Sequence, residues 1–171
     1  NTEAMCLFKT TSDAHLEEVF DAGAETNVPD DVKWAGLDES QRTAVKRLYA
    51  WIRSCVPDGA TSADLSTFKS EKFRDEISDY FDKAFLLTYY LWTDYFLAVD
   101  QRAKNMMLRT WDGLIWYITY YDGDTQMGKR NDCFLVYDYT TDRDTYDAEA
   151  GKYAFEGRDS WLWNLVLANL D

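Results

Sequence analysis

The sequence predicts an α+β fold that is rich in helix and contains a small β-hairpin or sheet. Three observations predict it: apolar residues at spacings of three and four in several segments, a later segment rich in β-branched and aromatic residues, and a turn dipeptide inside that segment. The 171 residues are 46% hydrophobic and 16% aromatic, enough to bury a core. We therefore expect one compact domain over residues 1–171 and exclude an intrinsically disordered chain.

The first clear helix begins at a capping box. Asp38 is followed three residues later by Gln41, and apolar residues then recur every three or four positions until the helix ends before Pro57. The preceding residues 1–37 are expected to form an N-terminal segment and a polar surface connection. Residues 38–171 then form the helical and hairpin core.

Two more helices are predicted before the middle of the chain. Ser70 has the chemistry of a capping residue and precedes a short helix that contains Phe73 and Ile77. The segment from Phe81 to Ala98 is apolar on most sides, and such a helix needs neighbours all around it. We therefore expect this segment to be the buried helix at the centre of the domain.

In the second half of the chain the pattern changes to that of strands. β-branched and aromatic residues around the dipeptide Asp112-Gly113 predict a hairpin from Asn105 to Tyr121. A further strand is expected from Phe134 to Tyr139. The C-terminal segment is expected to be an amphipathic helix capped at Asp159 or Ser160.

The charge of the chain excludes several functions. Eighteen basic and 31 acidic side chains give a net charge of −13, so direct binding to a nucleic-acid backbone is not expected. An acidic protein that mimics nucleic acid stays open. The longest apolar run, from Phe85 to Val99, is interrupted by Asp94 and is too short for a bilayer, so we expect no membrane span.

The sequence lacks the motifs of common enzyme classes. Cys6, Cys55 and Cys133 are widely spaced with no C-x-x-C, so we expect free thiols. His15 is the only histidine and receives no role, and no nucleophile elbow, P-loop or dinucleotide-binding glycine motif occurs. Because the chain begins with Asn1 and shows no signal-peptide pattern, we expect it to be a fragment of a longer protein.

One group of polar residues has the order that phosphoryl transfer requires. Asp100 is followed five positions later by Asn105, directly before the predicted hairpin, and Asp122 and Asp124 stand directly after it. A carboxylate that meets the acceptor hydroxyl, together with an amide and carboxylates that hold Mg²⁺, would serve this chemistry. Each motif alone occurs by chance in acidic chains, so the order of the elements carries the hypothesis.

The segment from Phe81 to Gly128 resembles the catalytic lobe of the spore-coat CotH kinase-like family, an atypical branch of the protein-kinase fold. The matching residues are Asp100, Asn105, Asp122, Asp124 and Gly128. The resemblance implies a kinase C-lobe-like fold, with Asp100 as the catalytic base or positioning residue. It also implies that Asn105, Asp122 and Asp124 hold Mg²⁺ or Mn²⁺. Gly123 departs from the family, which favours a large apolar residue between the two aspartates.

A wider resemblance joins the chain to large structural proteins of tailed phages that carry a CotH-like region. It rests on five strings: 6–9, 89–91, 99–105, 120–128 and 160–164. This resemblance implies a phage tail or virion protein, located in the virion, with other virion proteins as partners. No glycine-rich strand precedes the first predicted helix, and Lys9 is the only early lysine on a plausible strand. We therefore expect no phosphotransfer by this chain, and weak binding of Mg²⁺ or Mn²⁺ at most.

Other interpretations of the same residues stay open. Asp100 and Asn105 also suit a loop that bonds its own backbone, whereas Gln126 and Met127 do not fit a calcium loop around Asp124. Aromatic residues at helix and strand spacing usually belong to a core rather than a stacking surface. The alternative function is a small acidic inhibitor in the host cytoplasm, which would mimic nucleic acid and block a basic host or defence protein.

Overall fold

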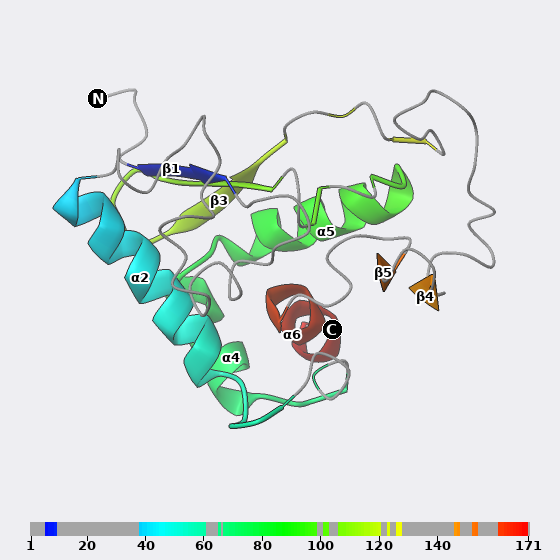
Figure 1. The fold of residues 1–171 in the computed structure, drawn as a ribbon, viewed down its shortest axis with the longest axis horizontal. Coiled ribbons are helices and arrows are strands. Elements are labelled where there is room, and N and C mark those ends of the chain that lie inside the picture. The colour runs from blue at the N-terminus through cyan, green and yellow to red at the C-terminus, as the bar shows by residue number, and fades with distance from the viewer. Residues whose placement is uncertain are drawn as a thin grey trace.

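The computed structural model describes residues 6–9, 38–60, 65, 67–98, 101–102, 106–120, 123, 126–127, 146–147, 152–153 and 161–170 (Figure 1). The helices are α2 (Glu39–Ser54), α4 (Glu71–Glu76), the short 3-10 helix η3 (Ile77–Asp79), α5 (Lys83–Tyr95) and α6 (Trp161–Asn169). The strands are β1 (Cys6–Lys9), β2 (Met107–Thr110), β3 (Trp116–Thr119), β4 (Tyr146–Asp147) and β5 (Lys152–Tyr153). The fold is therefore α+β, as predicted. No described helix has the length and apolar character that crossing a membrane requires.

The N-termini of three helices are fixed by side-chain caps. The Asp38 carboxylate accepts a 2.9 Å hydrogen bond from the Gln41 amide, and the Gln41 side chain accepts one from the Asp38 amide, which confirms the predicted capping box of α2. The predicted cap at Ser70 is also confirmed, because its hydroxyl accepts from Phe73 N at the start of α4. Asp82 caps α5 in the same way.

Three antiparallel strands form one sheet in the order β1-β2-β3. Met107 pairs with Thr119 and Thr110 pairs with Trp116, which confirms the predicted hairpin. Its loop is held by Asp112, whose carboxylate accepts hydrogen bonds from Leu114 N and Ile115 N. These backbone bonds lower the pKa of Asp112. A separate pair, β4-β5, lies within the stretch of sequence that is rich in acidic residues.

The core beneath the sheet is built around stacked aromatic rings. The buried Trp51 of α2 lies between Phe73, at a ring-centre distance of 5.4 Å, and Tyr80, at 4.2 Å. Arg47 places its guanidinium carbon 4.1 Å from the Tyr80 ring centre and donates to the carbonyl of Leu114. Helix α2 is thereby joined both to η3 and to the hairpin loop.

Cys55 follows α2 and is a buried free thiol, as expected. Burial raises its pKa to about 12, because the thiolate would lose its hydration there. The side chain therefore behaves as a small apolar group at neutral pH. Cys6 and Cys133 are not among the residues whose side chains are described.

The central helix is α6, which corrects two predictions. Its buried residues are Leu162, Trp163, Asn164, Leu165, Val166, Ala168 and Asn169, and it lies between α4 and α5 in Figure 1. The prediction of an amphipathic helix here was wrong, because Trp161 is partly buried and only Leu167, at 44%, is exposed among the residues of the helix. Its predicted caps lie outside the described residues.

The prediction that the segment from Phe81 to Ala98 forms the buried central helix was also wrong. Helix α5 spans only Lys83–Tyr95 and buries Leu86, Tyr89 and Thr93, while Leu91 and Tyr95 are 64% and 80% exposed. Apolar content on all sides predicted burial on all sides, but one side of α5 carries large apolar residues at the surface. The predicted strand from Phe134 to Tyr139 and the polar connection before Asp38 lie outside the described residues.

A substitution at Asn169 would show how strongly the stability of the protein depends on the polar contacts of α6. Its side chain accepts from Ser70 N at 2.7 Å and donates to the carbonyls of Phe68 and Leu165. We expect Asn169→Leu to lower the free energy of unfolding in urea by about 3 kcal/mol, because buried partners lose their hydrogen bonds. Leu167→Ala on the same helix should change it by less than about 0.5 kcal/mol. Equal unfolding midpoints for the two variants would contradict this role of Asn169.

Candidate functional site

The four residues of the predicted site lie outside the described residues. They are Asp100, Asn105, Asp122 and Asp124, so no distance among them follows from the structure. Residues beside them are described. We call the segment between Ala98 and Met106, which contains Asp100 and Asn105, the first loop, and the segment between Tyr120 and Met127, which contains Asp122 and Asp124, the second loop. The described residues that flank the predicted site are Gln101, Arg102, Met106, Gly123, Gln126 and Met127.

The first loop leaves α5 through a sharp turn. Ala98 N donates a 2.8 Å hydrogen bond to Thr93 O, and Leu97 N donates to Asp94 O, which together form the Schellman arrangement of a helix C-terminus. Leu97 has a φ of 54°, a left-handed conformation that glycine adopts more readily. A leucine in this conformation implies that the surrounding contacts offset its strain.

The second loop returns to the same end of α5. Met127 N donates a 2.7 Å hydrogen bond to the carbonyl of Phe96, the residue that caps the helix. Met127 also has a positive φ, of 57°. The chain four residues before Asp100 and the chain three residues after Asp124 thus meet at one helix end.

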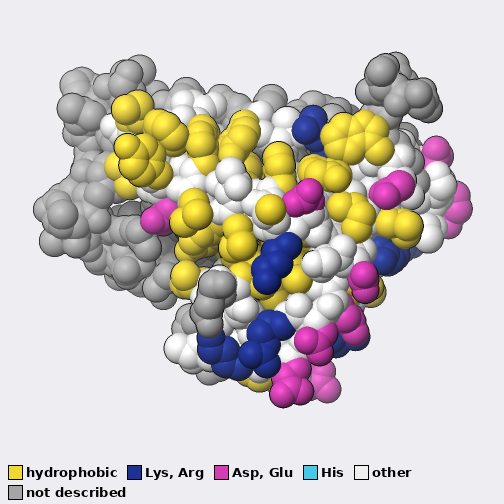
Figure 2. Space-filling model, turned by 180° about the vertical axis from the view of Figure 1, so that it is seen from behind, with side chains coloured by type: hydrophobic (Ala, Val, Ile, Leu, Met, Phe, Trp, Pro, Cys, Tyr) yellow, Lys and Arg dark blue, Asp and Glu magenta, His cyan; other side chains and the backbone are white. Residues whose placement is uncertain are grey.

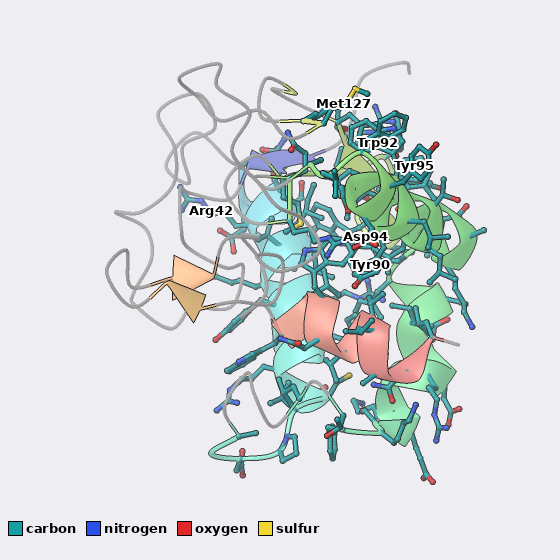
Figure 3. All side chains as sticks on the ribbon, turned by 90° about the vertical axis from the view of Figure 1, so that its right-hand side faces the viewer. Arg42, Tyr90, Trp92, Asp94, Tyr95 and Met127 are labelled. Carbon is teal, nitrogen blue, oxygen red and sulfur yellow. The ribbon has the colours of Figure 1, made fainter. Side chains whose placement is uncertain are left out.

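Arg102 fastens the first loop to α5. Its Nε donates to Thr93 Oγ1 at 2.9 Å, and its Nη2 donates to the carbonyl of Tyr90 and to Asp94 Oδ1, both at 3.1 Å. The guanidinium carbon also lies 4.0 Å from the Tyr90 ring centre. Figure 3 shows Tyr90 and Asp94 side by side on the side of α5 that faces α6. The side chain of Arg102 is only 9% exposed, so these contacts hold it inside the protein.

Two further side chains hold the backbone of this loop. The phenol of the buried Tyr89 donates to the carbonyl of Gln101 at 2.7 Å, and the indole N–H of Trp163 donates to the carbonyl of Arg102 at 2.8 Å. Burial raises the pKa of Tyr89, and the nearby Tyr120 raises it further. The hydroxyl therefore stays protonated and remains a donor. Helices α5 and α6 therefore both position the residues that follow Asp100.

The second loop has a close contact of its own. A Cβ atom built at Gly123 would overlap with the side-chain amide of Gln126, so the amide occupies the space that a side chain at 123 would need. Because this amide is the end of a flexible side chain, it can move aside, so the contact alone does not require a glycine between the two aspartates. A larger residue there would displace Gln126.

A surface of apolar side chains adjoins the two loops, and we call it the aromatic band. Its residues are Leu91, Trp92, Tyr95, Phe96, Tyr120 and Met127. Ring centres lie 4.1 Å apart for Trp92 and Tyr120, and 5.3 Å apart for Trp92 and Phe96. Figure 3 shows Trp92, Tyr95 and Met127 gathered at one end of α5, and Figure 2 shows hydrophobic side chains spread across this face.

The aromatic band holds most of the large hydrophobic residues that are exposed in the described part of the chain. Seven large hydrophobic residues are exposed in the described part of the chain, and four of them, Leu91, Tyr95, Tyr120 and Met127, belong to the band. Met127 is 67% and Tyr120 is 42% exposed. The prediction that the aromatic residues here belong to the core therefore holds for Tyr89 and fails for Tyr95.

Arg102 and the aromatic band were both missed from the sequence. Arg102 stands inside the D-x-x-x-x-N string, but nothing in that spacing tells an inward-facing arginine from an exposed one.

The acidic residues of α2, α4 and α5 do not form a metal site. Within the described ranges, no three His, Cys, Asp or Glu side chains are grouped so that they could hold a metal.

Comparison of the chain with protein-family models, with curated proteins and with solved structures finds no match. No family membership follows from the comparisons.

The role of Arg102 predicts a local effect on the first loop. In Arg102→Met, the amides of Ala98 and Gln101 should exchange with solvent hydrogen at least about tenfold faster, since the bonds that hold the turn are lost. Arg47→Met is the matched control, because Arg47 also stacks on a tyrosine and donates to two backbone carbonyls, away from this loop. It should leave Ala98 and Gln101 unchanged, and the same acceleration in both variants would contradict a local role.

Proposed function

We propose that the chain is a structural protein of a tailed-phage virion or tail, and that its kinase-like region does not transfer phosphate in this chain alone. The sequence resemblance described above suggests the class. The structural observation that supports it is the aromatic band, an exposed apolar surface on a protein of high net charge.

The band has the composition of a protein contact surface. Single exposed apolar residues are common, but a contiguous group of them is typical of a site that another protein covers. Tyrosine, tryptophan, phenylalanine and methionine are the residue types enriched in such interfaces, and the band consists of these and one leucine. We infer that another virion protein packs on this face.

The alternative function would use a different surface. An acidic inhibitor that mimics nucleic acid would bind its basic partner through carboxylates, with strong dependence on salt. The net charge of −13 favours this alternative in a general way. Contact through the band would depend on apolar area and only weakly on salt.

The two functions can be separated in particles. We expect the protein in purified virions, and we expect the double variant Leu91→Ser with Tyr95→Ser to be incorporated at least about tenfold less, since anchor residues each contribute above about 1 kcal/mol. Leu167→Ser, which changes an exposed leucine of α6 outside the band, should be incorporated normally. Absence of the protein from virions, with salt-sensitive binding to a basic host protein, would support the inhibitor instead.

We further propose that Asn105, Asp122 and Asp124 bind Mg²⁺ or Mn²⁺ weakly, with Asp100 beside them. Carboxylate and amide oxygens suit such cations, which bind weakly when no phosphate completes their shell. The convergence of both flanking segments on the C-terminal end of α5 supports this arrangement. Phosphoryl transfer also needs a lysine-bearing lobe that holds the phosphates, and the sequence offers no clear one.

Metal binding and phosphoryl transfer can be tested with one set of variants. Titration with Mn²⁺ should give a dissociation constant on the order of 1 mM, weakened by Asp122→Asn but not by Asp75→Asn, an exposed change on α4. Radiolabelled nucleotide should leave no label on the chain or on added acceptors. Transfer that disappears in both Asp100→Ala and Asp122→Ala would show instead that the chain is an active kinase.

A further inference from the structure

The structure describes two aspartate-glycine pairs in opposite environments. They are Asp58-Gly59, directly after α2, and Asp112-Gly113, in the hairpin loop. An aspartate before glycine is chemically special, because glycine has no side chain to hinder attack of its backbone nitrogen on the preceding carboxyl group. Whether the attack occurs depends on how freely the carboxyl group and that nitrogen can move.

The first pair is open to solvent. Pro57, Asp58 and Gly59 are all exposed, and the turn that contains them is closed by the bond from Ala60 N to Pro57 O, of 3.1 Å. Gly59 has a φ of 75° and no atom within 4 Å of the place where a Cβ would stand. Within the described part of the chain, neither the Asp58 carboxylate nor the Gly59 N–H has a hydrogen bond.

The second pair, Asp112-Gly113, is held by hydrogen bonds. The Asp112 carboxylate accepts from Leu114 N at 2.8 Å and from Ile115 N at 2.9 Å. Gly113 is buried, and its N–H donates to the hydroxyl of Thr110 at 3.0 Å. Both the attacking nitrogen and the carboxyl group are thus held by other partners.

We propose that Asp58 is a site of spontaneous isoaspartate formation in the folded protein, and that Asp112 is protected from it. The Gly59 nitrogen attacks Cγ of Asp58, a new N–C bond forms, and the carboxyl oxygen leaves as water, which gives a cyclic succinimide. Water then opens the ring at either carbonyl. One opening restores aspartate, and the other leaves the backbone running through the side-chain carbonyl, so no oxidant or partner is consumed.

The product changes the local chemistry of the turn. The backbone gains one methylene between α2 and the residues that follow, and the carboxylate moves onto the α-carbon. Because these residues are exposed and contribute no side chain to the core, the modified chain stays folded. The site is therefore suited to gradual modification that accumulates with the age of the protein.

The experiment ages the folded protein near neutral pH and maps its peptides by electron-transfer fragmentation, which tells isoaspartate from aspartate. Isoaspartate should accumulate at Asp58 at least about tenfold faster than at Asp112, because several hydrogen bonds must open before Asp112 can react. In the chain unfolded by urea, the two sites should react at similar rates. Equal rates at the two sites in the folded protein, or no reaction at Asp58 while the unfolded chain reacts there, would overturn the proposal.

A matched pair of variants gives a second measurement. Asp58→Asn and Asp112→Asn introduce an amide that is lost through the same succinimide, and the loss is seen directly as a change in mass. Asp58→Asn should lose its amide quickly in the folded protein, and Asp112→Asn should keep it until the protein is unfolded. Faster loss from Asp112→Asn than from Asp58→Asn would contradict the assignment.

Discussion

The burial of α6 is the constraint on which the rest of the structure depends. A helix that is apolar on nearly all sides must be surrounded, and α4 and α5 lie on two sides of it. Burying it also leaves polar groups that need partners. Asn169 satisfies the Ser70 amide at the start of α4, and the Trp163 indole reaches the backbone of the loop that follows α5. The last helix of the sequence thus positions segments from its middle.

The burial of α6 also affects the candidate site, because Arg102 contacts this helix. Its carbonyl accepts from α6, and its side chain is bound along the last turns of α5. The loop after Asp100 is therefore held on two helices at once. Since Met127 joins the same helix end, both predicted loops depend on where α5 terminates.

Features set by neighbouring residues could be predicted from the sequence, and features set by distant packing could not. The caps at Asp38 and Ser70 and the hairpin around Asp112 each depend on a few adjacent positions, and the structure confirms them. The choice of the central helix was wrong because α5 and α6 are both rich in apolar residues. Composition does not distinguish apolar residues that pack inside from those, such as Tyr95, that form an exposed surface. The spacing of the four predicted site residues stays a prediction.

The inward position of Arg102 has an electrostatic consequence for any anion near the loop. An arginine whose guanidinium is paired with Asp94 and bound to Thr93 and Tyr90 has few donors left to offer a phosphate. Its positive charge is largely offset by the adjacent carboxylate, so the field outside the loop is weaker than the count of basic residues in the sequence suggests. The Arg102 side chain thus serves as an internal contact between this loop and α5, and not as a binding group for an anion.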